Sequence, residues 1–232
     1  MDLESVQPPE NTNMYPKNWR ALRPGHLEAQ GQALHVNILD LAPQPIPTGR
    51  LVIKDSMGFG PTSQRVIRTI PGSSELKATI LEQGESKMLA YLSLIFSKEE
   101  AHSFHDLTPT FDGELLSNMS SSKKGGFTNR TSYAMMIDEQ LLKEGLPLDD
   151  DHCYSMLCHW QNTLSDHPTE WEGARLTLPG ERGEEALTFF KTRRITGQTL
   201  LWQESNEEGF PLRIHVDLGL MERVFSSDDQ QG

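Results

Sequence analysis

The segment from Leu212 to Leu218 constrains the fold most strongly, because apolar and polar residues alternate along it without interruption. Successive side chains of a β-strand point to opposite faces of a sheet, so this period of two predicts a strand with one buried face. The residues expected on the buried face are Leu212, Ile214, Val216 and Leu218. Those expected to point to solvent are Arg213, His215 and Asp217.

Similar short runs, separated by proline and glycine, occur through most of the chain. Residues 33–41 also alternate, and Pro43, Pro45 and Pro47 are expected to end that strand. Four runs that follow predict an antiparallel meander, at residues 50–54, 65–70, 76–81 and 88–96. Further strands are predicted at residues 174–178, 187–195 and 199–203.

Capping signals predict three helical segments. Ser97-Lys98-Glu99-Glu100 has the form of a capping box and predicts a short helix to about His105. Asp138 is placed to cap a helical turn over residues 139–144, which Gly145 would terminate. Asp149-Asp150-Asp151 supplies a cap and favourable negative charge for a helix to about Leu164.

These patterns predict an α+β fold of β-rich antiparallel sheets, sandwich-like, with two or three short helices. A chain of 232 residues with 36% apolar content can bury one continuous core. We expect an irregular N-terminal arm over residues 1–30, a single globular domain over 31–225 and a flexible tail over 226–232. Aromatic residues such as Tyr15 and Trp19 could tie the arm to the body.

The charge balance restricts the partners of this chain. It has 33 Asp and Glu against 21 Lys and Arg, a formal net charge of -12. This excess of negative charge opposes binding to nucleic acid and to an anionic membrane surface, and it favours fast association with a basic protein. The N-terminus lacks a signal-peptide pattern, and the two cysteines, Cys153 and Cys158, suggest no disulfide framework. We therefore expect a cytoplasmic protein.

Two segments contain the residue types of a metal site. His102 and His105 would lie about one helical turn apart, but no third ligand is evident nearby. His152 and His159 would stand roughly 10 Å apart along a helix axis, so one ion cannot bind both of them together with Cys153 and Cys158. We expect neither a metal nor a cofactor.

Motifs for catalysis are also missing from the sequence. There is no Gly-x-Ser-x-Gly elbow, and Pro61 follows Gly58-Phe59-Gly60 where a dinucleotide-binding helix would begin. No catalytic residue is predicted, although an acid and a base could still converge in the fold. The candidates for such a hydrolase or lyase site are Asp55, His105, Asp138 and His215.

Several stretches between residues 46 and 220 carry a resemblance to a known family. They are Gly49-Arg50-Leu51-Val52-Ile53-Lys54-Asp55, Pro71-Gly72, Met88 to Ser97, Gly197 through Trp202, Gly209 and Val216-Asp217-Leu218-Gly219. On these residues the chain resembles the bacterial family known as domain of unknown function 4241. The resemblance implies a C-terminal hairpin with a tryptophan-containing strand, but it implies no activity. The family pattern has acidic residues and glycines where this chain has Asn129-Arg130-Thr131-Ser132 and Gln203-Glu204-Ser205.

Acidity, absent motifs and resemblance together predict a non-enzymatic bacterial binding protein, specifically an immunity-type protein that neutralises a toxin. Its contact surface should join exposed aromatic residues with carboxylates. The candidate contact residues are Asp149, Asp150, Asp151, Glu170, Trp171 and Glu172. Helix capping and core packing are the structural alternatives for these residues. A hydrolase or lyase, and a structural subunit of an assembly, are the alternative functions.

Overall fold

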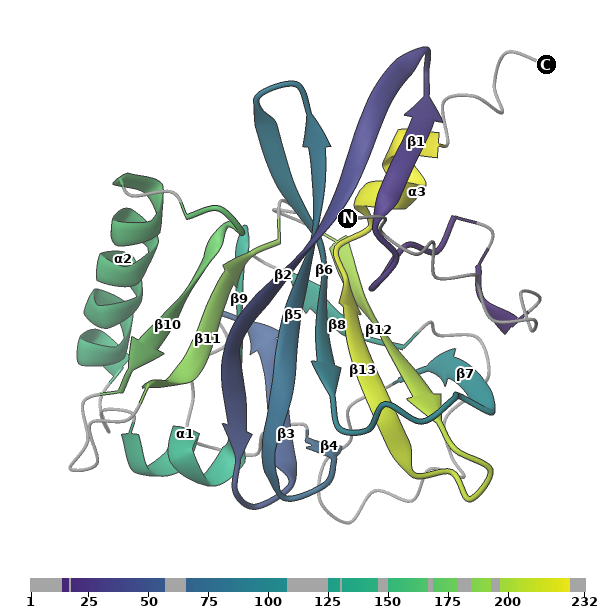
Figure 1. Cartoon of the computed structure of the whole chain (residues 1–232). Helices are drawn as coiled ribbons and strands as arrows, with labels where there is room; N and C mark the ends of the chain where they lie inside the picture. The colour runs from purple at the N-terminus through teal and green to yellow at the C-terminus, as the bar shows by residue number, and fades with distance from the viewer. Residues whose placement is uncertain are drawn as a thin grey trace.

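The computed structural model describes residues 14–16, 18–56, 66–107, 125–129, 131–145, 150–166, 169–178, 185–192 and 197–225. Within these residues, antiparallel strands form two sheets, and three short helices lie outside them (Figure 1). The predicted α+β, β-rich and sandwich-like fold is therefore confirmed.

The first sheet contains eight of the described strands. Their order across the sheet is β1 (Gly25–Ala29), β2 (Gln32–Ile46), β5 (Gly72–Gln83), β6 (Ser86–Ile95), β13 (Pro211–Asp217), β12 (Gly197–Ser205) and β7 (Ser103–Asp106). The eighth strand, β8 (Phe127–Asn129), also pairs with β12. Helix α3 (Leu220–Phe225) follows β13 and lies beside β1 at one end of this sheet (Figure 1).

The second sheet contains five described strands. Their order is β10 (Gly173–Thr177), β11 (Glu185–Lys191), β9 (Tyr133–Asp138), β3 (Arg50–Asp55) and β4 (Ile67–Arg68). Helix α1 (Glu139–Gly145) begins directly after β9, and α2 (Asp150–Asp166) covers the face of this sheet that points away from the first sheet (Figure 1).

Buried apolar side chains hold the layers together. Leu92 and Ile214 of the first sheet pack with Met136 and Phe190 of the second sheet in the core between the sheets. On the other face of the second sheet, Met135, Ile137 and Phe189 pack against residues of α2 that include Leu157, Trp160 and Leu164. A third cluster covers the outer face of the first sheet, where Trp19 of the arm packs with residues of β6 and α3 that include Tyr91 and Met221.

The predicted meander is wrong, because β3 and β4 belong to the second sheet. Strand β2 pairs directly with β5, while β3 pairs with β9. Strand β3 buries both of its faces: Leu51 and Ile53 point into the core between the sheets, and Val52 packs in the cluster under α2. Burial on both faces explains the pairing of β3 inside a covered sheet, since it leaves no face for solvent.

Strand β2 also runs further than predicted. It continues through Pro43 and Pro45 to Ile46, with a register shift between Leu41 and Gln44. Strand β1 pairs only with residues 32–36 of β2, so the later part of β2 has β5 as its described neighbour in the sheet. A proline is tolerated in such a position because the missing N–H need not serve a second neighbour.

The helix predicted from Ser97 to about His105 is not formed. The Ser97 hydroxyl accepts a hydrogen bond from the backbone N of Glu99 at 3.2 Å, which closes a turn, and the chain then extends into β7. In β7, Phe104 pairs with Glu204 of β12. The ladder with β12 takes the backbone of this segment, so His102 and His105 do not share a helical face.

The other two helices follow the prediction closely. Asp138 caps α1, because its Oδ1 atom accepts a hydrogen bond from the backbone N of Gln140 at 2.9 Å. Its Oδ2 atom accepts from the Thr48 backbone N and hydroxyl at 3.0 and 2.7 Å.

The predicted irregular arm is wrong for residues 25–29, which form β1 on the free edge of β2. The predicted tail, residues 226–232, lies outside the described residues.

Candidate functional site

The predicted contact residues lie at opposite ends of α2. Asp151 is exposed in the first turn of the helix, whereas Glu170 and Trp171 come after its last residue. A helix of 17 residues is about 25 Å long, so the two groups do not form one surface. Asp149 and the side chain of Asp150 lie outside the described part of the structure.

Trp171 and Glu172 make structural contacts. The Trp171 ring is half-buried and packs against the core between the sheets. The Oε2 atom of Glu172 accepts a hydrogen bond from the backbone N of Leu89 at 3.1 Å, and its Oε1 atom lies 4.0 Å from the Nζ atom of Lys191. These contacts support the structural interpretation for both residues, while Glu170 remains exposed.

Two other aromatic side chains are exposed beside carboxylates. Tyr154 is 56% exposed and lies three residues after Asp151 on α2. Phe210 is 58% exposed and follows Glu207 and Glu208 in the loop between β12 and β13. At both places an exposed aromatic side chain lies near carboxylates in the sequence, which is the combination predicted for a contact surface. The sequence prediction names Trp171 instead, because no local pattern marks Phe210 as exposed.

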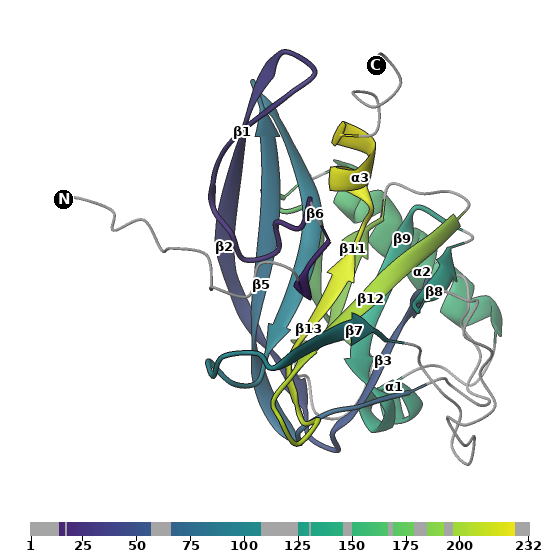
Figure 2. The same ribbon diagram turned by 90° about the vertical axis from the view of Figure 1, so that its right-hand side faces the viewer.

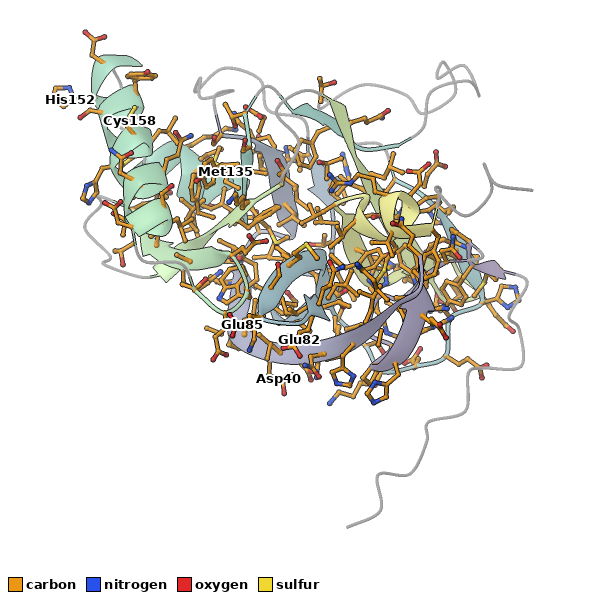
Figure 3. The ribbon with its side chains drawn as sticks, turned by 90° about the horizontal axis from the view of Figure 1, so that it is seen from above. Asp40, Glu82, Glu85, Met135, His152 and Cys158 are labelled. Atoms are coloured by element: carbon orange, nitrogen blue, oxygen red, sulfur yellow. The ribbon has the colours of Figure 1, made fainter. Side chains whose placement is uncertain are left out.

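The two histidines and Cys158 of α2 do not gather at one point, and the side chain of Cys153 lies outside the described part of the structure. His152 and His159 are exposed on the helix, and Cys158 is half-buried. Figure 3 shows His152 on the outer side of α2 and Met135 in the strand beneath the helix. Among the described residues, no group of three or more His, Cys, Asp or Glu side chains could hold a metal ion.

The candidate acids and bases of the alternative enzyme are not brought together either. Asp55 pairs with Ala134 and Asp138 pairs with Leu51, so the two carboxylates lie at opposite ends of the β3–β9 ladder. Asp55 accepts hydrogen bonds from the Thr131 backbone N at 2.8 Å and hydroxyl at 3.1 Å. His105 and His215 lie in the first sheet, where His105 is exposed on β7.

His215 corrects the prediction that it points to solvent, because its side chain is fully buried. Its Nδ1 atom lies 2.8 Å from the Ser93 hydroxyl, and its Nε2 atom lies 3.2 Å from Oε1 of Glu204. An ionised carboxylate only accepts hydrogen bonds, so Nε2–H donates to Glu204. In the neutral ring Nδ1 then accepts from the Ser93 hydroxyl, which produces a row of serine, histidine and glutamate.

Glu204 is the charged centre of this row. It forms a salt bridge with Arg213, and its Oε1 atom also accepts a hydrogen bond from the Tyr15 hydroxyl at 3.1 Å. Burial alone would raise the pKa of Glu204, but the hydrogen bonds and charges of His215 and Arg213 outweigh burial and lower this pKa to about 2. Burial and the Glu204 charge raise the pKa of Tyr15 to about 12.

The N-terminal arm covers the row. The Trp19 ring meets the His215 ring edge-on at 5.2 Å between centroids, and it also contacts Phe104 and Tyr91 at 4.9 Å each. The backbone N of Leu22 donates to the Thr79 hydroxyl at 3.2 Å. Trp19 is only 2% exposed, so the described part of the arm is packed on the body, and this packing explains the burial of His215.

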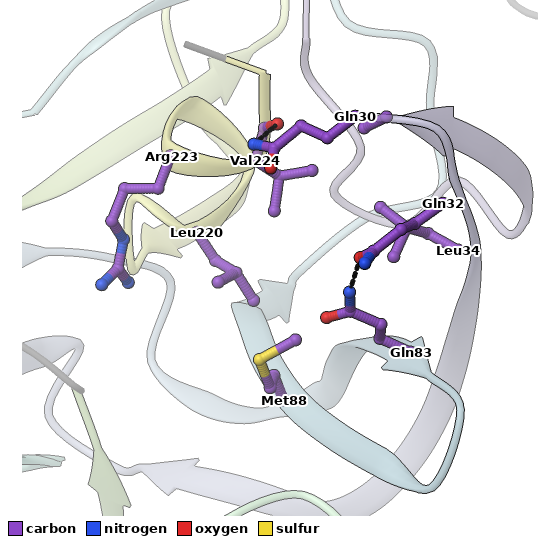
Figure 4. Close-up of a pocket in the computed structure, with 9 residues that line it drawn as sticks. Gln30, Gln32, Leu34, Gln83, Met88, Leu220, Arg223 and Val224 are labelled. Atoms are coloured by element: carbon purple, nitrogen blue, oxygen red, sulfur yellow. Dashed lines mark hydrogen bonds between the residues drawn. The ribbon is translucent and has the colours of Figure 1, made fainter. Parts of the chain in front are cut away.

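A pocket of about 400 Å³ lies between α3 and the ends of the β1–β2 and β5–β6 hairpins (Figure 4). Its apolar lining includes Leu34, Met88, Leu220 and Val224. Gln83 donates a hydrogen bond to Gln32 beside it, and the Gln30 side chain donates to the Val224 carbonyl at 2.9 Å. Arg223 is the one titratable residue among its described lining residues, so these residues offer no acid–base pair.

Comparisons of this chain with family models, with curated proteins and with solved structures give no match. The resemblance to domain of unknown function 4241 therefore stays a prediction from the sequence. At the departures from the family pattern, Thr131 bonds Asp55 and Glu204 bonds His215. None of the helices in the described part of the chain has the length and apolarity needed to cross a bilayer.

Proposed function

We propose that this chain is a non-enzymatic bacterial protein of the immunity type, which binds and neutralises a basic toxin in the cytoplasm. The observation that carries the proposal is the exposed Phe210, which follows Glu207, Glu208 and Gly209 in the loop of a chain of net charge -12. Buried aromatic side chains supply much of the energy of protein interfaces, so an aromatic exposed among carboxylates is suited to a protein partner.

The net negative charge of the chain also supports a basic protein as the partner. An acidic protein attracts a basic partner over distances of about 10 Å at moderate salt, which raises the rate of encounter. The carboxylates would orient the partner, and the aromatic side chain would then be buried against it. Fast electrostatic association followed by burial of an aromatic side chain suits an inhibitor that must bind its target quickly.

Co-expression with the products of the adjacent reading frames tests this function. We expect the chain to restore growth of cells that express a toxic neighbour, and to co-purify with that protein. A matched variant, Glu207→Lys with Glu208→Lys, should rescue less well at equal expression. Failure to rescue or co-purify with any neighbouring product would overturn the proposal.

A second candidate, a hydrolase, is favoured by one observation, the hydrogen-bonded row of Ser93, His215 and Glu204. A serine beside a base that is oriented by a carboxylate is the arrangement that activates a nucleophile. Since Trp19 and Tyr15 cover the row, this function requires displacement of the arm. Labelling of Ser93 by a fluorophosphonate in the Trp19→Ala variant would support it. Equal labelling of the Trp19→Ala variant and of the double variant that carries both Trp19→Ala and Ser93→Ala would eliminate this function.

A further inference from the structure

Phe210 lies at the tip of the β12–β13 hairpin. We define this hairpin tip as residues 206–211. Figures 1 and 2 place this tip at the end of the first sheet opposite α3. Phe210 has the largest exposed fraction among the large apolar side chains of the described residues. Burial of the exposed Phe210 ring by a partner would remove apolar surface from water and so contribute to the free energy of binding.

The hairpin tip is fixed before any partner arrives. The side-chain oxygen of Asn206 accepts hydrogen bonds from the backbone N atoms of Glu208 at 3.1 Å and Phe210 at 2.9 Å. The backbone N of Asn206 donates to the Phe210 carbonyl at 3.1 Å. Gly209 has a φ of 83°, a left-handed conformation that favours glycine. A rigid loop loses little conformational entropy on binding.

The base of the hairpin is attached to the segment that precedes β7. Arg213 donates a hydrogen bond to the Glu99 carbonyl at 2.7 Å. The backbone N of His102 donates to the Ser205 carbonyl at 2.8 Å. These bonds hold Glu99 and His102 beside the base of the hairpin.

Negative charge predominates at this end of the sheet. The exposed carboxylates are Glu99, Glu100, Glu207 and Glu208. The Nδ1 atom of His102 lies 3.8 Å from the Oε1 atom of Glu207. The Nζ atom of the nearby Lys98 forms an ion pair with the Oε1 atom of Glu75 at 3.1 Å. A partner that fits this surface needs cationic side chains around an apolar socket for the Phe210 ring.

We infer that the hairpin tip is the surface through which this chain binds a basic protein, whose apolar socket accepts Phe210 and whose cations face Glu207 and Glu208. The inference rests on the proposed function and names its contact surface. Tyr154, the other exposed aromatic, lies on α2 and belongs to a different element from the carboxylates of the hairpin tip.

Photo-crosslinking in cells of the source organism tests the surface. p-Benzoylphenylalanine is placed at position 210 in the full chain, and at position 154 in a matched control with similar exposure. We expect position 210 to give an adduct with one basic protein, identified by mass spectrometry, and position 154 to give none with that protein. The absence of an adduct at 210, an acidic partner, or the same adduct at both positions would overturn the inference.

The rescue experiment separates this inference from the proposed function. Rescue by the wild-type chain without an adduct at 210 would leave the immunity role standing and overturn the surface. An adduct with a basic protein at 210 without rescue would leave the surface standing and overturn the immunity role. Phe210→Ala should weaken binding to the cross-linked protein about tenfold or more, whereas Tyr154→Ala should leave it unchanged. Equal binding by both variants would contradict the inference.

Discussion

The Nε2 atom of His215 lies 3.2 Å from the Oε1 atom of Glu204, with both side chains buried in the first sheet. Segments far apart in the sequence meet at this pair, since Tyr15 of the arm bonds Glu204 and Ser93 of β6 bonds His215. Arg213 supplies the positive charge beside Glu204. The pair therefore joins the arm to the stem of the hairpin that presents Phe210.

Removing the charge of Glu204 should destabilise the fold. In Glu204→Gln, the partly buried Arg213 loses its counter-charge beside the buried His215, and we expect the free energy of unfolding to fall by about 3 kcal/mol. Urea denaturation at neutral pH measures the change. The exposed Glu208→Gln is the control and should change it by less than about 0.5 kcal/mol. Equal effects of the two substitutions would show that the buried pair does not hold the arm.

The low pKa of Glu204 predicts a specific acid dependence. The pKa is lowered from 4.5 to about 2 in the folded chain, so the unfolded state binds the proton first as the pH falls. The stabilisation is complete above about pH 4.5 and is lost as the pH falls towards about 2. We expect the stability difference between wild type and Glu204→Gln to shrink through this window. A constant difference across it would contradict the shift.

Truncation of Trp19 should release the arm. We expect Trp19→Ala to lose about 3 to 5 kcal/mol of stability, because a large buried ring leaves a cavity. Hydrogen exchange of the Leu22 amide, which bonds Thr79, should accelerate in this variant. Trp19→Phe keeps an aromatic ring and should retain part of the protection. Unchanged exchange at Leu22 in Trp19→Ala would mean that another contact holds the arm.

Lys54 should limit the stability of the fold. Burial lowers its pKa to about 8, although the neighbouring Asp55 carboxylate acts in the opposite direction. Since the unfolded state keeps the proton up to about 10.5, stability should rise with pH between about 8 and 10.5. We expect Lys54→Met to gain about 1 kcal/mol at pH 7, measured by urea denaturation against the half-exposed Lys87→Met. A loss of stability in Lys54→Met would contradict this.

Local patterns predicted the elements whose burial is decided within a few residues. The alternation from Leu212 to Leu218 predicted β13, and Asp138 predicted the start of α1. The partners of His215 are 122 residues away at Ser93 and 11 residues away at Glu204, so no local pattern marks it as buried. Its burial depends on Trp19, which a sequence pattern cannot place over a particular strand.

Pairing between distant strands limits sequence reasoning in the same way. Nothing in residues 50–54 distinguishes a strand of a meander from a strand of the second sheet. The difference depends on pairing with β9, whose residues come more than 80 positions later in the sequence, as Asp138 does after Leu51. Residue type alone predicts the contact residues, and the structure separates them because Asp151 lies in the first turn of α2 and Glu170 follows its last residue. Phe210 was missed because exposure of an aromatic residue in a hairpin depends on the fold around it.

The proposed function requires that this acidic chain bind a basic protein. Isothermal titration calorimetry with the purified basic product of the neighbouring gene measures that binding. We expect a stoichiometric complex whose affinity falls at least about tenfold when the salt concentration rises from about 0.1 M to 1 M. No heat of binding, or an affinity that does not change with salt, would contradict it.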